Sequence, residues 1–466
     1  MKNIREKLIR DKLDIVLLLL VVMLFGYFAF FKEVFEYGDS FQYLHQYPMR
    51  EPVYSLLLQL LQTVFGEAFM PVLGYVQNLL AVICIYFGYR RLSDIYEFGP
   101  LFRIGTMVFL LAPHVLTPLA SQTHLVLTDS VMTEGITVSV FYVWMTILLG
   151  ILTDYYGEKK SKAVTVNIVL ATVLALTRGQ MAVCIIMWLL VMIYKAIDTK
   201  KYKLIVLFAV VAVCAFPIKS QITKWYNLAE TGFYVDTVSS KPMLLANIVY
   251  VAEEEDANAI EDEVLKKAFA QTVAKAKADG ITFDNASGGI IEKALFHESV
   301  HEILNFEYVD PAMREVIAQK DGIDEEQFLQ LMIREDELCG SVAKSVLPAL
   351  APRYIHNYIY IVMLGFVRSI AAEKAFLPLL ALILYIAAVA LTVMLLLKNK
   401  KDKSAISMIA VLVGICGTVC GTSLVIECIT RYMIYNLPFF YIAGMAMLNS
   451  VTKTYGIKKF LKKEAK

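Results

Sequence analysis

DIVLLLLVVMLFGYFAFF, residues 14–31, is an apolar run of the length that crosses a membrane. A helix of roughly 20 mostly apolar residues spans a hydrocarbon core about 30 Å thick. No small-residue cleavage site follows this run, so we expect it to be retained as the first span. The sequence therefore predicts an all-α, polytopic transmembrane helical bundle of about ten spans. We place these spans at residues 14–31, 70–89, 103–120, 131–152, 163–177, 181–195, 203–219, 376–397, 405–426 and 434–451.

The composition also indicates a membrane protein. Hydrophobic residues make up 58% of the 466 residues, and the mean hydropathy is +0.59, which excludes a soluble globular domain. The formal net charge of +1 gives no sign of a nucleic-acid partner. We therefore expect membrane lipids among the partners and no nucleic acid.

Basic residues gather in short clusters between the apolar runs. With the spans counted above, every cluster falls on the same side of the membrane, which the positive-inside rule makes the cytoplasmic side. We expect a multi-pass protein of the cell membrane with both termini in the cytoplasm. The clusters are Lys2/Arg5/Lys7/Arg10/Lys12, Arg90/Arg91/Arg103, Lys159/Lys160/Lys162, Lys195/Lys200/Lys201/Lys203, Lys398/Lys400/Lys401/Lys403 and Lys458/Lys459/Lys462/Lys463.

Two apolar stretches stay outside the span count, residues 52–65 and 354–370, because the first is short and the second carries His356 and Arg368. We expect both to be helices along the outer interface or against the bundle. Between the spans, residues 220–353 form a polar insert that the topology places outside the cytoplasm, after about the seventh span, and their charge pattern predicts a mostly helical domain. The chain then divides into an N-terminal transmembrane region (1–219) with a first-loop catalytic segment (32–66), the extracytoplasmic domain (220–353, with helices expected over 252–277, 289–306 and from Asp310), and an interfacial helix with the C-terminal transmembrane region (354–466).

Charged and aromatic residues follow the first span on the outer side. Asp39 comes directly after Gly38, which we expect to let the backbone turn tightly and present the carboxylate toward the bundle. Tyr43 and His45 add aromatic and hydrogen-bonding groups, a lining that suits a sugar. The alternative is an ordinary exposed loop carboxylate.

Two acidic residues stand where the fourth span begins. Asp129 is a candidate site carboxylate, although the stretch Thr128-Asp129-Ser130 also offers N-cap chemistry for the helix that follows. Glu134 lies about a turn deeper, where a carboxylate needs a cation or a proton.

Few basic residues remain near the spans on the outer side. Arg50, Arg178 and Arg431 are the best placed to hold a phosphate through forked hydrogen bonds. Tyr432 follows the last of them in the chain. Snorkelling of these arginines to lipid headgroups is the competing account.

This layout resembles the GT-C superfamily of integral-membrane glycosyltransferases, which holds the protein O-mannosyltransferases and the lipid A aminoarabinose transferases. The likeness covers most of the membrane part. It is carried by Gly38-Asp39-Ser40, Glu51-Pro52-Val53-Tyr54, Val64-Phe65-Gly66, and Arg431-Tyr432 with Pro438.

The resemblance implies a polyprenyl-phosphate sugar as donor, an acceptor hydroxyl on the outer face and inversion at the anomeric carbon. Asp39 would take the proton of the acceptor hydroxyl. Arg178 and Arg431 would neutralise the charge that develops on the leaving lipid phosphate, and Arg50 and Tyr432 would orient it.

The resemblance leaves two points open. Asp129 would either hold the acceptor or, paired with Asp39, bind a divalent metal ion through carboxylate oxygens. The acceptor is a glycan, a lipid or a protein, and it is not carried over from the family because the polar domain here interrupts the bundle instead of trailing it.

Two other classes of function compete with a glycosyltransferase. His297-Glu298-Ser299-Val300-His301 matches the pattern of a zinc metalloprotease, in which His297 and His301 would bind the metal and Glu298 would act as the base. Glu302 follows directly and no third ligand stands out, while the neighbouring residues form an ordinary amphipathic helix. The histidines then either lie on a plain helix surface or contact a metal or the acceptor in the service of the transferase. A lipid or polysaccharide transporter would need charges or broken helices at the membrane midplane, and the sequence shows neither.

Overall fold

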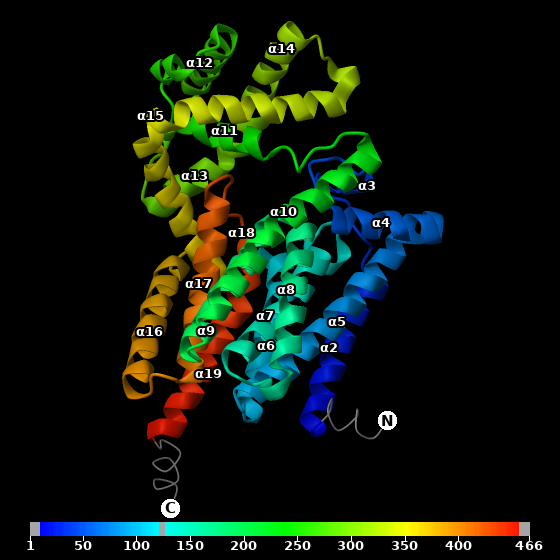
Figure 1. Cartoon of the computed structure of the whole chain (residues 1–466), viewed down its shortest axis with the longest axis vertical. Coiled ribbons are helices and arrows are strands. Elements are labelled where there is room, and N and C mark those ends of the chain that lie inside the picture. Colours follow the sequence, from blue (N-terminus) through cyan, green and yellow to red (C-terminus); the bar gives the residue numbers. More distant parts are fainter. Residues whose placement is uncertain (1–9, 121–125, 456–466) are drawn as a thin grey trace, which may run out of the picture.

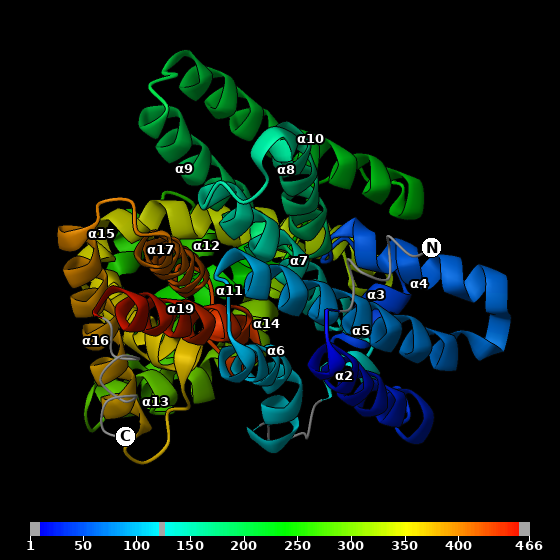
Figure 2. The same ribbon diagram turned by 90° about the horizontal axis from the view of Figure 1, so that it is seen from below.

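The computed structural model describes residues 10–120 and 126–455. Figure 1 shows an upright helical bundle that carries a second layer of helices at its upper end, and Figure 2 shows the same bundle from below. The described part contains helices and no strand, apart from a single parallel bridge between Phe35 and Ser130. The expected all-α architecture is thereby confirmed.

Nine segments of the described ranges are long and apolar enough to cross a membrane, so the chain is a multi-pass membrane protein. They are α2 (Lys12–Phe31), α4 and α5 counted together (Pro52–Phe65 and Phe69–Ile95), α6 (Pro100–Ala120), α7 (Glu134–Leu152), α8 (Lys160–Thr177), α9 (Val183–Asp198), α10 (Lys203–Thr231), α16 (Leu377–Lys398) and α17 (Lys403–Ser423).

Helix α7 is the centre of the bundle. In its most apolar stretch 89% of the residues are buried, against 11% for α10, which lies at the periphery. The tenth expected span, residues 434–451, forms α19 (Leu437–Tyr455), which packs against α6 and α17. This helix is less apolar than the nine because it carries Asn449, Ser450 and Lys453.

Both ends of the described chain lie at the lower end of the bundle in Figure 1. The connections from α5 to α6, from α7 to α8, from α9 to α10 and from α16 to α17 lie at that end as well. Four of the expected basic clusters are therefore gathered there. Lys2, Arg5, Lys7 and the basic residues of 458–463 lie outside the described residues.

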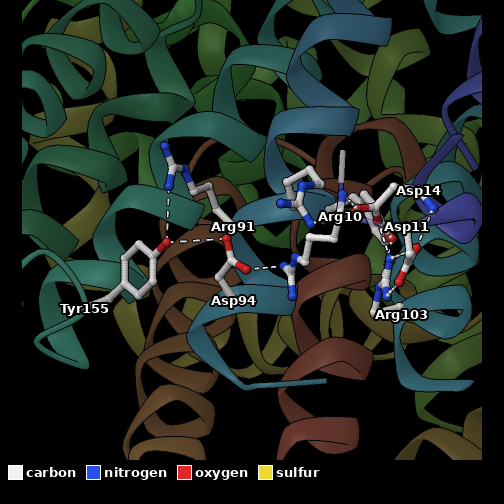
Figure 3. Close-up of polar contacts among 9 residues, drawn as sticks. Arg10, Asp11, Asp14, Arg91, Asp94, Arg103 and Tyr155 are labelled. Carbon is white, nitrogen blue, oxygen red and sulfur yellow. Dashed lines mark hydrogen bonds and ion pairs between the residues drawn. The ribbon is translucent and has the colours of Figure 1, made fainter. Parts of the chain in front are cut away.

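An ion-pair network joins three helices at this lower end (Figure 3). Asp14 of α2 is 0% exposed, and it pairs with Arg90 of α5 at 3.0 Å and with Arg103 of α6. Arg103 also pairs with Asp11 at 2.7 Å, and the Tyr89 hydroxyl donates to Asp14 at 2.6 Å. A buried carboxylate needs such partners, so part of the basic cluster at residues 90–103 holds helices together.

The two apolar stretches left out of the span count take different positions. Helix α4 lies across the upper end of α5 in Figure 1. Residues 354–370 are instead the last part of α15 (Phe328–Ile370), which changes direction in Figure 1 and runs into the bundle beside α17. Pro348 and Pro352 lie inside α15, and proline bends a helix by removing a hydrogen bond. This stretch is therefore continuous with the layer of helices that residues 220–353 form, the polar layer. It packs against the bundle and is not a separate interfacial helix.

The helices of the polar layer do not end where the composition changes. Helix α10 continues past residue 219 to Thr231, and α15 runs across residue 353, because helical hydrogen bonding continues through the polar residues at both places. The layer further contains α11 (Ser240–Val251), α12 (Glu263–Ala278), α13 (Ile290–Ile303), a π-helical stretch (Leu304–Val309) and α14 (Asp310–Asp321).

The polar layer has a core of its own. Tyr250, Phe269 and Leu304 are fully buried in it. The sequence does not predict α11, because most residues of this helix are buried and no amphipathic period remains to reveal it. The helix expected from residue 252 begins only at Glu263, since Glu253 and Asp256 form a capping box that opens a 3₁₀ turn (Glu254–Ala259).

Candidate functional site

A cavity of about 280 Å³ lies between the bundle and the polar layer. It is at the end of the bundle opposite the Asp14 network. Its walls come from the first loop, the turn between α8 and α9, the polar layer and the segment that leads into α18 (Thr430–Met433). Six residues that the sequence singles out line this one cavity: Asp39, Tyr43, Arg50, Arg178, Arg431 and Tyr432.

The backbone before Asp39 is fixed by pairing with the segment that precedes α7. The Phe35 amide donates to the carbonyl of Asp129 at 2.8 Å, and the Val131 amide donates to the carbonyl of Phe35 at 3.0 Å. The Ser40 hydroxyl donates to the Val131 carbonyl at 2.9 Å. These bonds hold the chain on both sides of Asp39, whose side chain remains 32% exposed toward the cavity.

The prediction that the turn at Asp39 depends on Gly38 is wrong. Gly38 is not in the left-handed region, and a Cβ at this position would meet nothing within 4 Å. Ser40 sets the turn instead, because its hydroxyl accepts from the Tyr37 amide at 2.7 Å while its own amide donates to the Tyr37 carbonyl at 2.9 Å.

Two arginines bracket the Asp39 carboxylate. Nη2 of Arg50 lies 3.1 Å from Oδ1, and Nη2 of Arg431 lies 3.3 Å from Oδ2. Arg50 is held in place by Gln42, whose Oε1 accepts from Nε at 2.6 Å, and it packs over the Tyr43 ring at 4.9 Å. The carboxylate and both guanidinium groups line the cavity together.

Glu134 lies beneath this layer, and the third arginine pairs with it. Glu134 is 0% exposed, with Oε1 placed 2.5 Å from Nη1 of Arg178 and 4.0 Å from Nε of Arg431. Arg178 and Arg431 also face the same ring, that of Tyr432, at 4.5 and 5.2 Å. Three guanidinium groups therefore meet two carboxylates, Asp39 and Glu134, while three further carboxylates, Glu51, Glu302 and Glu427, line the same cavity.

Asp129 and His45 do not line the cavity. Asp129 is 3% exposed, and its carboxylate accepts a hydrogen bond from Asn78 at 2.6 Å. It therefore supports the first loop from the side that faces away from the cavity. Burial raises the pKa of Asp129 to about 6, although the Asn78 bond lowers it. His45 is exposed, and its nearest ring is that of Tyr47 at 6.0 Å.

The polar layer and the segment before α18 supply further residues, and among them His301 alone is a candidate from the sequence, as a metal or acceptor contact. His301, Glu302 and Glu427 all line the cavity. Nδ1 of His301 lies 2.7 Å from Oε2 of Glu427, and Nε2 lies 3.2 Å from the Met243 carbonyl oxygen. Both partners are acceptors, so the geometry favours a doubly protonated imidazolium.

The charges of these residues follow from their surroundings. Burial lowers the pKa of His301, but Glu427 outweighs burial and the net shift is upward. Burial raises and His301 lowers the pKa of Glu427, which falls to about 2. Burial raises the pKa of Glu302, and the nearby carboxylates Glu427 and Asp39 raise it further. Glu427 stands only four residues before Arg431, which is the one sequence signal that could have identified it.

The His-Glu-Ser-Val-His stretch has its own partners in the polar layer. Nε2 of His297 lies 2.7 Å from Asn247 Oδ1, and Glu298 pairs with Arg368 at 2.6 Å. His301 turns toward Glu427 instead. Among the described residues, no three His, Cys, Asp or Glu side chains are grouped so that they could hold a metal ion.

Comparisons with protein-family models, with curated proteins and with solved structures give no match for this chain.

Proposed function

We propose that this chain is a membrane glycosyltransferase with a fold of the GT-C type. It moves a sugar from a polyprenyl-phosphate donor to an acceptor hydroxyl on the outer face of the membrane, with inversion at the anomeric carbon. One observation carries the proposal. Three separate parts of the chain, with Asp39 and Arg50 in the first, Arg178 in the second and Arg431 in the third, share one cavity at a single end of the spans.

The charges in this cavity suit a phosphate. Guanidinium groups bind phosphate through two parallel hydrogen bonds, and Arg50, Arg178 and Arg431 all line this cavity. Burial of Glu134 beneath Arg178 keeps that arginine in place, and Tyr432 supports the guanidinium planes of Arg178 and Arg431.

Asp39 is the carboxylate that can act as the base. Its oxygen would accept the proton of the acceptor hydroxyl while that hydroxyl oxygen forms the new bond to the anomeric carbon. The bond from the anomeric carbon to the phosphate oxygen breaks, and the lipid phosphate leaves with the electron pair. Arg178 and Arg431 stabilise the charge that develops on this leaving group.

Donor binding and activation of the base are coupled in this arrangement. The contacts of Asp39 to Arg50 and Arg431 are 3.1 and 3.3 Å, longer than the about 2.8 Å of a strong charge-assisted bond. A phosphate that enters beside Arg431 competes with Asp39 for the same N–H groups. The carboxylate then loses these partners, and its oxygens are free to accept a hydrogen bond from the acceptor hydroxyl.

We further propose that the lower end of the bundle in Figure 1 is cytoplasmic. Four basic clusters lie in the helix connections at that end, and positive residues mark the cytoplasmic side of membrane proteins. The cavity then opens at the outer side of the cell membrane, where an acceptor from the cell envelope is available.

The test uses the full chain in lipid nanodiscs with polyprenyl-phosphate hexoses carrying glucose, mannose, galactose or N-acetylglucosamine. Wild type is expected to release polyprenyl phosphate from one of them, with a water molecule taking the sugar in place of the acceptor hydroxyl. Asp39→Asn is expected to lose this activity by about 10²- to 10⁴-fold. Glu263→Gln, in which the side chain is 84% exposed on α12, is the matched control and keeps the wild-type rate.

The other classes give different results in the same preparations. Cleavage of a peptide that stops on addition of a chelator and is lost in Glu298→Gln would identify a metalloprotease. Movement of an intact lipid-linked sugar across the bilayer, without release of lipid phosphate, would identify a transporter. Either result contradicts the transferase.

A further inference from the structure

A second chamber of about 150 Å³ opens beside the main cavity and reaches into the polar layer. The two are adjacent, because they share wall residues. One part of the shared wall is the π-helical stretch between α13 and α14, which places both Asn305 and Phe306 on the two cavities. Stretches of π-helix are rare and often occur at functional sites. The full set of shared residues is Gln42, Met49, Ser239, Met243, Asn305 and Phe306.

The inner end of the chamber is polar. Asp310 and Glu335 line it and are 9% and 4% exposed. Arg314 lies 3.8 Å from Asp310 and 3.3 Å from Glu335. Oδ1 of Asp310 and Oε1 of Glu335 are buried, and the two carboxyl groups are close enough to hydrogen-bond to each other. Carboxyl oxygens have lone pairs enough to accept a further hydrogen bond from a ligand.

The two carboxyl groups together can donate as well as accept hydrogen bonds. Burial raises the pKa of both Asp310 and Glu335, and the closeness of Asp310 raises the pKa of Glu335 further. A pair in this state carries a proton and presents one donor beside several acceptors. With Arg314 the group is close to neutral, so it suits a ligand with many hydroxyl groups better than an ion.

The outer end of the chamber is aromatic. Phe41 and Phe306 line it and are 44% and 53% exposed. Phe328 also lines the chamber, and Tyr47 packs between Phe41 and Phe328 with ring distances of 5.7 and 5.5 Å. A sugar ring has this same division, because its C–H faces pack on aromatic rings while its hydroxyls need hydrogen bonds.

We propose that this chamber is the acceptor subsite and that it binds a neutral saccharide. The sugar ring held by Phe306, Asp310 and Glu335 would be the unit next to the hydroxyl that enters the main cavity and faces Asp39. The inference rests on the proposed function and narrows its acceptor to a carbohydrate.

Two other acceptors fit the chamber less well. A lipid acceptor would place apolar chains against Asp310, Glu335 and Arg314, at a cost in lost hydration. A peptide that binds by strand addition would need an exposed strand edge, and the described residues contain no strand.

The experiment measures saccharide binding to the full chain in detergent by saturation-transfer NMR. The probes are methyl β-glucopyranoside, methyl β-galactopyranoside, methyl α-mannopyranoside, cellobiose and maltose. Wild type is expected to transfer saturation to at least one of them. Phe306→Ala and Glu335→Gln are each expected to weaken that binding by about tenfold. Phe376→Ala, 70% exposed beside α16, is the matched control with unchanged binding.

Two results overturn the inference: no saccharide binds to wild type, or binding is the same in Phe306→Ala as in wild type. Because Phe306 is exposed, its removal leaves the fold intact even where Glu335→Gln lowers the melting temperature. Release of polyprenyl phosphate, with water taking the sugar, is measured on the same wild-type sample. A wild type that binds saccharides but releases no lipid phosphate contradicts the transferase proposal instead, so the two failures are distinguishable.

Discussion

Nη2 of Arg431 lies 3.3 Å from Oδ2 of Asp39, although 392 residues separate the two in the chain. One comes from the loop after the first span and the other from the segment before the last helix. Their contact places a candidate base next to a candidate phosphate ligand. The guanidinium group of Arg431 also lies 4.0 Å from the buried Glu134, so Arg431 contacts both carboxylates of the cluster.

Removal of the Arg431 charge should weaken the donor reaction more than the fold. We expect Arg431→Gln to lower the rate of lipid-phosphate release by about 10²-fold, the typical loss when one group that stabilises a leaving oxyanion is removed. Arg334→Gln, on the partly exposed face of α15, is the control with a wild-type rate. Equal rates in Arg431→Gln and wild type would show that the guanidinium group has no part in the reaction.

Arg178 should matter for stability as well as for activity. Its loss leaves Glu134 buried with a hydrogen bond from the Thr133 hydroxyl and with the 4.0 Å contact to Arg431 as its one cationic contact among the described residues, so Arg178→Met should lower the free energy of unfolding by about 3–5 kcal/mol. The double variant Arg178→Met/Glu134→Gln should recover most of this loss, because no unpaired charge remains. Melting temperatures in nanodiscs measure both, and additive losses in the double variant would contradict the pairing.

The Asp129 carboxyl should make stability depend on pH. Its folded pKa is about 6 against an ordinary value of 3.8, so the folded state holds the proton more tightly and the associated stability is lost as the pH rises through 6. Asp129→Asn cannot lose a proton. Relative to wild type it should gain about 1–3 kcal/mol between pH 4 and pH 7.5. Thermal melts at the two pH values check this, and a variant that becomes relatively less stable at pH 7.5 would mean that the charged carboxylate is the favoured form.

The network at the opposite end should affect the fold without affecting the chemistry. Asp14→Asn leaves Arg90 and Arg103 with one carboxylate fewer in a buried place, and we expect a loss of about 3 kcal/mol or more in the free energy of unfolding. Asp94→Asn, at a pair with side chains 33% and 26% exposed, should cost about 1 kcal/mol or less. The rate of lipid-phosphate release per folded molecule should match wild type in both.

The membrane part could be predicted from the sequence because length and hydropathy decide which segments cross a bilayer. The stretch 14–31 became α2 within two residues at its start. The positive-inside rule then placed Asp39, Arg178 and Arg431 on the same side of the membrane. Because all three lie in loops at one end of a compact bundle, they are expected to be close in space. Ends of helices were less predictable, since α10 and α15 continue through residues whose composition indicates a boundary.

The remaining part of the site depends on packing that leaves no local signal. His301 reaches the cavity because α13 packs against α11 and α15, and Glu427 becomes its partner only in that arrangement. Asp129 and Glu134 have similar surroundings in the sequence, yet one supports a loop and the other pairs with Arg178. The difference lies in which neighbouring helix offers a cation, and a single sequence does not contain that information.

The most direct test of the account measures release of polyprenyl phosphate by wild type, Asp39→Asn, Arg431→Gln and the double variant in nanodiscs. Residues that act on one donor as a unit are not additive. We predict that wild type releases lipid phosphate, that each single variant loses about 10²-fold or more, and that the double variant loses little beyond the worse single variant. A wild type without release, or an Asp39→Asn variant with the full wild-type rate, would contradict the account.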